Sequence, residues 1–512
     1  MRLLPLFLLL LLACGTESTT TPMPETDLGQ AAIIPRPERV SATNSAFLLD
    51  QGVQISSVSV NTTDATKEKL DNLRSQFIDQ LGHFEIEQAL AGRSLQLALQ
   101  SPGNTVINED WYQLEIEEEA ITIRAWEIPG MHNGIQTLLQ LLALRGDNNY
   151  LPTGTIEDQA RFTHRGFMLD VSRHFFGPEV IKQVIDYLAF YKFNRLHLHL
   201  SDDQGWRLEV KSFPNLTAHG GSTEVGGGPG GFFTQAEYME LVEYASQRQI
   251  TIIPEFDMPG HTNAALASYP DLNCDGQARE LYTGTEVGFS SFCIHSEYTY
   301  YFVDSLIREV AAITPGPYIH IGGDEVHTLS AEDYAYFIER VAAIVHHYGK
   351  QVMGWDEIAQ SELPAGSVAQ YWNFAENAQA AVAQDAQVLF SPATRAYLDM
   401  KYDSTTELGL AWAAYIELKD AYDWDPVGMV EGVEEQHILG VEAPLWAETI
   451  EDLDDIEYLL FPRLAAISEV AWTSAGRKAW TDFQRRANDH SAWWSASDIN
   501  FYPSPDLQPK AE

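Results

Sequence analysis

The sequence predicts a (β/α)8 barrel of the TIM-barrel type, preceded by a small α+β domain. From Arg165 onward, eight short apolar segments of strand character occur in a row, and clear helices lie between several of them. Polar and aromatic residues collect at the carboxyl ends of these segments, where a barrel builds its active site. The chain has 512 residues and is 45% hydrophobic, which suits a barrel plus a smaller domain.

The N-terminus reads MRLLPLFLLLLLACG, in which one arginine precedes an apolar run too short to span a membrane. We interpret residues 1–14 as a signal peptide. The run ends in Leu-Leu-Ala-Cys14, which resembles a bacterial lipobox, so we expect lipidation of Cys14; an ordinary signal with a chance cysteine is the alternative. Residues 15–30 then form a polar tether. The protein is expected to be an exported lipoprotein, held at the periplasmic or outer-membrane face or outside the cell.

Residues 31–160 are expected to form the small domain. Residues 94–100 and 111–126 alternate apolar and polar side chains as strands do, and residues 131–145 have the pattern of an amphipathic helix. This unit has no cluster of paired acids or polar aromatic residues. We therefore interpret it as a supporting domain.

Residues 161–490 are expected to form the barrel, followed by a C-terminal tail over residues 491–512. A helix over 179–192 begins after Pro178, and another over 331–348 has the capping-box spacing of Ser330 and Asp333. The connections after the fifth and seventh strands are irregular. The eight expected strands are 165–171, 195–201, 249–256, 318–325, 351–357, 367–372, 386–392 and 437–448.

The charge balance of 31 basic against 73 acidic residues gives a net charge of −42. Such a surface repels nucleic acid and anionic lipid, so we expect no nucleic-acid partner and no membrane contact beyond the lipid anchor. Only Cys274 and Cys293 remain after Cys14. Export favours a disulfide between them, and two free thiols are the alternative.

The acidic and aromatic residues at the strand ends predict one pocket. Carboxylates accept hydrogen bonds from sugar hydroxyls, and indole rings stack on the apolar face of a sugar. Asp324 and Glu325 follow Gly322 and Gly323, which leave room for substrate or neighbouring backbone. An acid beside a second carboxylate and sealed by tryptophan is expected to have a raised pKa, as glycoside hydrolysis requires. The residues at the strand ends are Asp202, Asp203, Asp257, His261, Asp324, Glu325, Trp355, Trp372, Tyr397, Asp399, Trp446 and Glu448.

Two other functions compete with this interpretation. His197, His199 and His261 could form part of a metal site in a metal-dependent barrel hydrolase. The fifth and sixth strands end in tryptophan rather than in further ligands, so we expect no metal and no cofactor. A non-catalytic sugar-binding lipoprotein would use the same aromatic pocket without needing an acid.

Several motifs occur in one order along the chain: RGFMLDVSRHF, LHLHLSDDQGWR, PEFDMPGH, HIGGDEV, GWDE, YW, YLD and APLWAE. Together they resemble the motifs of glycoside hydrolase family 20, the β-N-acetylhexosaminidases, over about residues 31–480. The start of the small domain, IIPRPERV, also fits. The resemblance implies that terminal GlcNAc or GalNAc is removed from oligosaccharides with retention of configuration, through an oxazolinium-type intermediate formed by the substrate's own acetamido group.

The resemblance also implies a role for each residue. Glu325 would be the general acid and then the base, and Asp324 would orient the acetamido group. Arg165 would bind the outer hydroxyls O3 and O4, with Asp202 and His261 as a supporting pair near Glu325, and Asp257 behind it. The remaining roles are an acetamido pocket walled by Trp355, Trp372 and Trp446, a hydrogen bond from Tyr397 to the acetamido oxygen, and hydroxyl binding by Asp399 and Glu448.

Several properties stay open at this point. The natural substrate could be chitin fragments, host glycans or peptidoglycan pieces, and GlcNAc is not separated from GalNAc. A lacto-N-biosidase, which releases a disaccharide, shares much of the pattern. The oligomeric state is not predicted.

Overall fold

The computed structural model describes residues 26–49, 52–60, 62–90, 92–100 and 108–507. The predicted signal peptide and Cys14 lie outside these residues, as does most of the predicted tether. Of the tether, residues 28–30 form a 3-10 helix whose Leu28 is buried. Among the described residues, no helix has the length and apolar character needed to cross a lipid bilayer.

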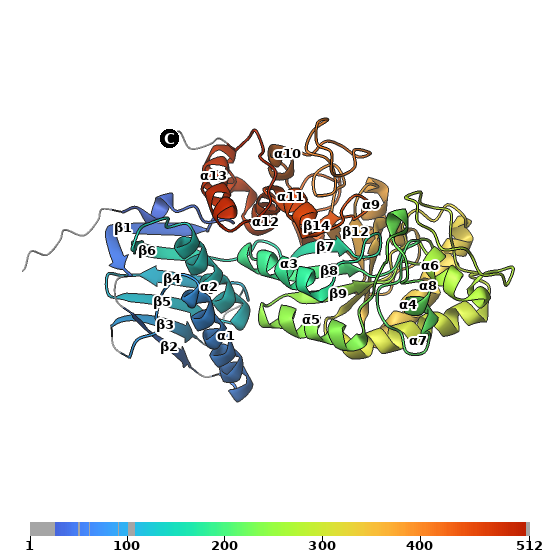
Figure 1. The fold of residues 1–512 in the computed structure, drawn as a ribbon, viewed down its shortest axis with the longest axis horizontal. Coiled ribbons are helices and arrows are strands. Elements are labelled where there is room, and N and C mark those ends of the chain that lie inside the picture. Colours follow the sequence, from blue (N-terminus) through green and yellow to red (C-terminus); the bar gives the residue numbers. More distant parts are fainter. Residues whose placement is uncertain (1–25, 50–51, 61, 91, 101–107, 508–512) are drawn as a thin grey trace, which may run out of the picture.

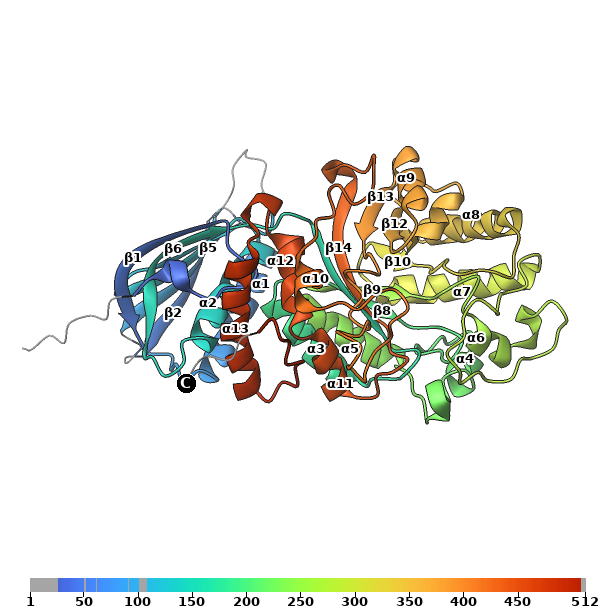
Figure 2. The same cartoon turned by 90° about the horizontal axis from the view of Figure 1, so that it is seen from above.

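The small domain is one six-stranded mixed sheet with two helices (Figure 1). Its strand order is β1-β6-β4-β5-β3-β2, and buried and part-buried residues alternate along the central strands because successive side chains point to opposite faces. Helices α1 and α2 cover the face turned toward the barrel (Figures 1 and 2). The elements are β1 (Arg39–Leu48), β2 (Val53–Ser59), α1 (Asp64–Gly82), β3 (Arg93–Leu99), β4 (Tyr112–Ile116), β5 (Ala120–Ala125), α2 (Ile128–Ala143) and β6 (Tyr150–Asp158).

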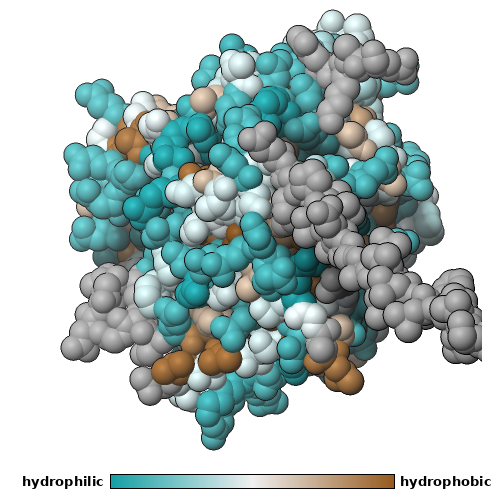
Figure 3. Space-filling model, turned by 90° about the vertical axis from the view of Figure 1, so that its left-hand side faces the viewer, coloured by the Kyte–Doolittle hydropathy of each residue, from teal (hydrophilic) through white to brown (hydrophobic). Residues whose placement is uncertain are grey.

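The opposite side of the small domain faces solvent. Figure 3 views the molecule from this side, where hydrophilic residues dominate and hydrophobic residues form small separate groups. The sheet therefore buries one face only, as expected for a supporting domain.

The second part of the chain is a closed barrel of eight parallel strands, as the sequence predicts. The strands follow each other around the barrel in chain order, and β14 closes it by pairing with β7. The strands are β7 (His164–Asp170), β8 (Arg195–His199), β9 (Thr251–Glu255), β10 (Tyr318–His320), β11 (Gln351–Trp355), β12 (Val368–Tyr371), β13 (Gln387–Phe390) and β14 (Ile438–Leu445).

Helices surround the barrel, and the two irregular connections occur where the sequence indicated them. The connection after β13 runs from 391 to 437 and contains only a short α-helix and a 3-10 turn. The α-helices are α3 (Pro178–Phe190), α4 (Asn215–Ala218), α5 (Gln235–Gln247), α6 (Asn263–Ser268), α7 (Glu297–Ile313), α8 (Ala331–His347), α9 (Ala375–Ala383), α10 (Leu418–Tyr422), α11 (Leu453–Leu460), α12 (Arg463–Trp472) and α13 (Trp480–Ala496). Further 3-10 helices occupy 225–227, 270–272, 356–360, 435–437 and 475–477.

The last helix, α13, runs beside the small domain (Figure 2). Its His490 ring nitrogen Nε2 lies 2.7 Å from the carbonyl oxygen of Ala32, which ties the end of the chain to its beginning. The barrel boundary expected at residue 490 therefore falls inside this helix. Sequence periodicity missed the helix because its mean composition is polar, with only one buried stripe.

Inward side chains fill the barrel in layers. Ile253, Met353, Val368 and Leu389 form an apolar cluster in which each residue is at most 1% exposed. Residues alternate between inside and outside along a strand, so the next inward positions toward the carboxyl ends include Glu255 and Trp355. The barrel is thus closed below its upper rim, and a ligand can enter only from the carboxyl-terminal end.

The connection after β9 carries the predicted disulfide. Cys274 and Cys293 are bonded, with their Cα atoms 4.8 Å apart. This confirms the expected pairing, and it ties both ends of a loop at the rim of the barrel.

A buried ion pair joins the two domains. Arg165, at the start of β7, places both terminal nitrogens 2.9 Å from the carboxylate of Asp110, which precedes β4. Its side chain is only 2% exposed, and its guanidinium carbon lies 4.9 Å from the ring centre of Trp472. Lys192 and Asp158 form a second buried pair nearby, 3.4 Å apart.

We predict that Arg165→Met destabilises the folded protein by about 3–5 kcal/mol, because it leaves the buried Asp110 carboxylate without its cation. Arg39→Met is the matched control, since Arg39 also pairs with an acid at 3.0 Å but its side chain is 66% exposed. The control should cost less than about 1 kcal/mol. Thermal unfolding of both variants checks this, and equal losses would contradict a structural role for the buried pair.

Candidate active site

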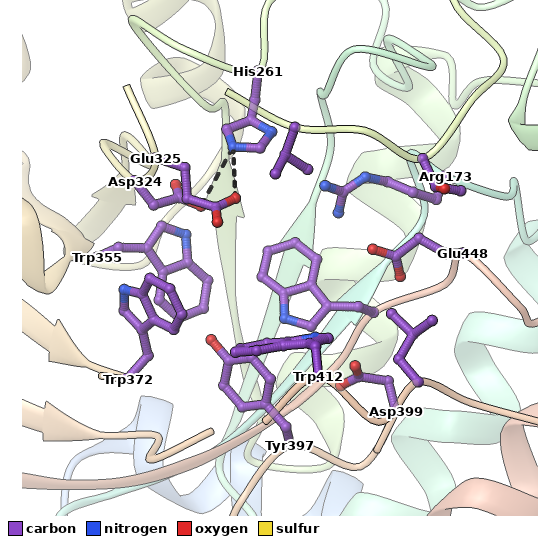
Figure 4. A pocket seen from close by; sticks show the side chains of 14 residues that line it. Arg173, His261, Asp324, Glu325, Trp355, Trp372, Tyr397, Asp399, Trp412 and Glu448 are labelled. Atoms are coloured by element: carbon purple, nitrogen blue, oxygen red, sulfur yellow. Dashed lines mark ion pairs between the residues drawn. The ribbon is translucent and has the colours of Figure 1, made fainter. Parts of the chain in front are cut away.

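A pocket of about 210 Å³ opens at the carboxyl-terminal end of the barrel (Figure 4). Its acidic, aromatic and basic side chains come from the ends of all the barrel strands except β8, and the loops after β9 and β13 add further residues. The predicted residues that line it are His261, Asp324, Glu325, Trp355, Trp372, Tyr397, Asp399, Trp446 and Glu448, together with Arg173, Thr285, Val287, Leu410 and Trp412, which the sequence analysis did not select.

The acidic pair sits on a left-handed turn directly after β10. Gly322 has φ 68°, and a Cβ there would lie 1.8 Å from the Asp257 Oδ1 atom. The glycine is therefore required by a close approach of the Asp257 side chain, which accepts the Gly323 N–H at 3.1 Å. Glu325 itself has φ 51°, an unfavourable conformation for a residue with a side chain, and such strain concentrates at functional sites.

His261 connects the acidic pair to a buried carboxylate behind it. Its Nδ1 lies 3.2 Å from Asp202 Oδ1, and its Nε2 lies 3.7 Å from Asp324 and 3.6 Å from Glu325 (Figure 4). Asp202 does not line the pocket; it is 1% exposed and supports His261 from behind. The structure therefore brings together the supporting pair that the sequence predicted.

The charges at this centre follow from burial and neighbours. Burial lowers the pKa of His261, but Asp202, Asp324 and Asp257 outweigh it and raise the pKa well above its usual value, so the ring is a cation. Burial, opposed by His261 and reinforced by Glu325, raises the pKa of Asp324 to about 6. Burial also raises the pKa of Asp257 well above its ordinary value, which keeps this carboxyl protonated.

Glu325 departs from the expectation of a raised pKa. Burial pushes its pKa upward, but the nearby positive charges of His261 and Arg173 outweigh burial and lower it. Its side chain is 31% exposed, against 10% for Asp324, so solvent still stabilises its carboxylate. In the open pocket the raised pKa therefore belongs to Asp324, and the expectation for Glu325 was wrong for this state.

Indole rings form one wall of the pocket. Trp355 and Trp446 lie 5.5 Å apart between ring centres, and Tyr397 is 6.4 Å from Trp446. The Trp355 indole nitrogen donates to Glu255 at 2.9 Å, and that of Trp372 donates to Glu357 at 3.0 Å. These bonds hold the nitrogen edges of the two rings, which lie side by side along the pocket (Figure 4).

Acids and an arginine form the other side. Burial and Glu448 raise the pKa of Asp399 well above its usual value, which leaves a neutral carboxyl beside a second acid. Both carboxyl oxygens of Asp399 and one of Glu448 are buried without a hydrogen-bond partner within the described part of the chain. Asp324 Oδ1 is in the same condition. Buried polar groups are normally bonded, so these atoms mark places where a ligand supplies the partners.

The structure corrects the role of Arg165. This residue lies at the amino-terminal start of β7, bonded to Asp110, at the end of the barrel away from the pocket. Arg173, three residues beyond the carboxyl end of β7, lines the pocket instead. It pairs with Asp170 at 3.0 Å and with Asp202 at 2.8 Å. Like the other predicted residues, Arg173 follows the carboxyl end of a strand, so its position alone predicts a place in the pocket.

Trp412 was missed for a different reason. It belongs to the aperiodic connection after β13, which gives no strand or helix pattern to place it. Its ring lies 5.9 Å from Trp372 and 6.0 Å from Tyr397, and it is 56% exposed at the pocket mouth. Only the folded chain brings this residue to the site.

Some side chains at and beneath the pocket could approach a metal ion. Asp257, His261 and Asp324 offer ligand atoms within 4.8 Å of one another, and so do His197, Glu255 and His320. His261 is protonated between its acids, and a cationic ring has no free electron pair for a metal. The first group therefore suits proton transfer better than metal binding.

The chain matches two family descriptions. Residues 162–475 match the catalytic domain of glycosyl hydrolase family 20, and residues 30–159 match domain 2 of the same family. A β-N-acetylhexosaminidase of Cellulomonas fimi is 40% identical over 93% of this chain and 97% of its own length. A β-hexosaminidase of Porphyromonas gingivalis is 32% identical over 98% of this chain and 68% of its own.

Solved structures agree. The family 20 β-N-acetylhexosaminidase of Streptomyces coelicolor is 42% identical, with a TM-score of 0.87 over 94% of this chain and 99% of its own. A mutant Streptomyces plicatus β-hexosaminidase in complex with its product GlcNAc is 42% identical, with a TM-score of 0.88 over 96% of this chain and 99% of its own. With the family models covering both domains, this chain belongs to glycosyl hydrolase family 20.

Proposed function

We propose that this protein is a retaining β-N-acetylhexosaminidase that removes one terminal GlcNAc or GalNAc at a time from oligosaccharides. The observation that carries the proposal is the adjacent pair Asp324 and Glu325, both within 4 Å of the protonated His261 and facing a wall of indole rings. Relatives named as β-N-acetylhexosaminidases and the GlcNAc complex of the Streptomyces plicatus enzyme support it.

The two acids divide the work. Asp324 is the more buried, and its unpartnered Oδ1 can accept the N–H of a 2-acetamido group. The acetamido oxygen then attacks C1, the bond to the leaving group breaks, and Glu325 delivers a proton to the departing oxygen. Glu325 next deprotonates a water molecule, which attacks C1 and breaks the bond between C1 and the acetamido oxygen. This step opens the oxazolinium ring, restores the acetamido group and gives the product with retained configuration.

Substrate binding would move the proton between these acids. An acetamido N–H on Asp324 favours its carboxylate and lowers its pKa from about 6. A sugar that covers Glu325 removes the water that now reaches its side chain and raises its pKa. Both changes put the proton on Glu325, where the general acid needs it.

The far side of the pocket suits the sugar hydroxyls. Arg173 offers donors beside the paired acids Asp399 and Glu448, whose unpartnered oxygens can accept or donate hydrogen bonds. The pocket volume of about 210 Å³ favours one sugar ring over the disaccharide that a lacto-N-biosidase would hold.

We predict that Glu325→Gln lowers kcat for natural oligosaccharides by about 10²–10⁴-fold, because the amide has no proton to give. The loss should be smaller for nitrophenyl glycosides, whose leaving group needs less protonation, and binding should persist. Steady-state kinetics on both substrate types check this. Unchanged rates on both would exclude Glu325 as the acid.

We predict that successive fluorination of the N-acetyl methyl lowers kcat/KM steeply, because fluorine withdraws electrons from the attacking oxygen. Asp324→Asn should be severely impaired, since a neutral amide stabilises the charged intermediate less. In the wild type, kcat/KM should fall as the pH rises through about 6, because the free enzyme then loses the proton that substrate binding passes from Asp324 to Glu325. A flat response to fluorination, or a glycosyl ester trapped on Asp324, would contradict this mechanism.

We also propose that the protein is exported and held at the membrane by a lipid on Cys14. The short apolar run ending in Leu-Leu-Ala-Cys supports this, and so does the Cys274–Cys293 disulfide, which suits an oxidising compartment. The acidic composition, with a net charge of −42, gives the chain no other means of attraction to anionic lipid.

We predict that the mature protein isolated from its native host begins at a diacylglycerol-modified Cys14. Mass spectrometry of the N-terminal peptide checks this. A Cys14→Ser variant serves as control, and it should appear in the soluble fraction. A mature N-terminus elsewhere, without lipid, would rule the anchor out.

A further inference from the structure

One of the buried glutamates lies beneath the pocket and has none of the roles above. Glu255 ends β9, and its exposed fraction is 0%. Its Oε1 accepts the indole N–H of Trp355 at 2.9 Å, and its Oε2 lies 2.5 Å from the Nδ1 atom of His199. Two further imidazoles surround it, His197 at 3.0 Å and His320 at 2.9 Å.

The first contact fixes the pocket wall. Trp355 is 1% exposed and lines the pocket, and its indole nitrogen has this glutamate as its acceptor. An indole donates one hydrogen bond only, so that bond sets the rotation of the ring about its side-chain axis. The position of Glu255 therefore decides how the ring faces the acetamido group of a substrate.

The second contact reaches the acidic pair. His199 donates one ring nitrogen to Glu255 and lies with the other 2.9 Å from Asp202. Both nitrogens face carboxylates, so both carry hydrogens and the ring is a cation. Asp202 in turn holds His261, which faces Asp324 and Glu325.

The charge of Glu255 is stable in this position. Burial raises its pKa, but His199, His320 and His197 outweigh burial and hold it well below its usual value. The carboxylate of Glu255 is hydrogen-bonded to the imidazolium of His199 and to the indole N–H of Trp355. It keeps a fixed geometry, because breaking either bond would leave a buried polar atom without a partner.

We propose that Glu255 is a positioning residue for the reaction. This one carboxylate fixes the Trp355 ring in the pocket wall. Through His199 and Asp202 it also fixes the imidazolium of His261. The distance between the Trp355 ring and the His261 imidazolium is therefore held constant. The inference rests on the proposed function and adds to it a residue that does not touch the sugar.

Glu442 provides a matched control. It is also a glutamate at 0% exposure inside the barrel, and it also bonds two imidazoles, His164 at 2.9 Å and His197 at 2.8 Å. Its third contact is the amide of Gln370, and none of these partners lines the pocket. His197 lies between Glu442 and Glu255, but Glu442 bonds neither Trp355 nor His199. Removing its charge should therefore leave the hydrogen bonds of Trp355 and of Asp202 in place.

The experiment compares Glu255→Gln with Glu442→Gln. The first should lower kcat/KM on nitrophenyl N-acetylglucosaminide by about 10–100-fold, as loss of a supporting partner typically does. Its affinity for a thiazoline that mimics the oxazolinium should fall in parallel, since only the reaction geometry is lost. The second should stay within about threefold of the wild type in both, at a comparable loss of thermal stability.

Equal effects of the two variants, or an unchanged thiazoline affinity in Glu255→Gln, would overturn the proposal. If Glu255→Gln does not fold, Trp355→Phe decides, because it removes the same hydrogen bond and leaves an aromatic ring in the wall. It should lower thiazoline affinity about tenfold, the lower end of the same range, and no change would again overturn the proposal. A wild type without turnover would refute the proposed function instead.

Discussion

The arrangement of the active site depends on the buried charge of the Asp202 carboxylate. A charge with 1% exposure is held in a barrel only by cations, and Asp202 has three of them, Arg173 at 2.8 Å, His199 at 2.9 Å and His261 at 3.2 Å. Those cations lie at or just beyond the carboxyl ends of three successive strands, β7, β8 and β9. Satisfying one buried charge therefore brings together the arginine of the sugar pocket and the imidazolium that faces the acids, which explains why the strand ends converge as one site.

The same requirement explains how the aromatic side of the pocket is held. Trp355 donates to the buried Glu255, and Trp372 donates to the part-buried Glu357, so neither indole N–H depends on solvent. Burial, with the charges of Asp356 and Asp324, raises the pKa of Glu357 well above its usual value. Trp372 therefore donates to a neutral acid, whereas Trp355 donates to the ionised Glu255. The ring faces stay apolar while their edges are bonded, and this combination suits a sugar with an acetamido group.

The barrel and most of the pocket could be predicted from the sequence because strand ends in a barrel meet on one face, whatever their spacing in the chain. The prediction of site residues failed at positions that do not follow this strand-end rule. Arg165 was chosen from a motif although it begins β7, and its charge serves Asp110 in the other domain. Trp412 lies in a connection without periodicity, and the pKa order of Asp324 and Glu325 depends on how much water reaches each, which only the folded chain sets.

The layered filling of the barrel gives the pocket a single opening. Ile253, Met353, Val368 and Leu389 close the interior below the site, and the buried Glu255 and its imidazoles lie between them and the pocket. A released sugar must therefore leave through the same opening by which the end of the oligosaccharide entered. The shortened chain has to withdraw before the product can escape, so degradation of a long oligosaccharide is distributive: each cleavage is a separate encounter, and accumulating monosaccharide competes with every new chain end for the same entrance.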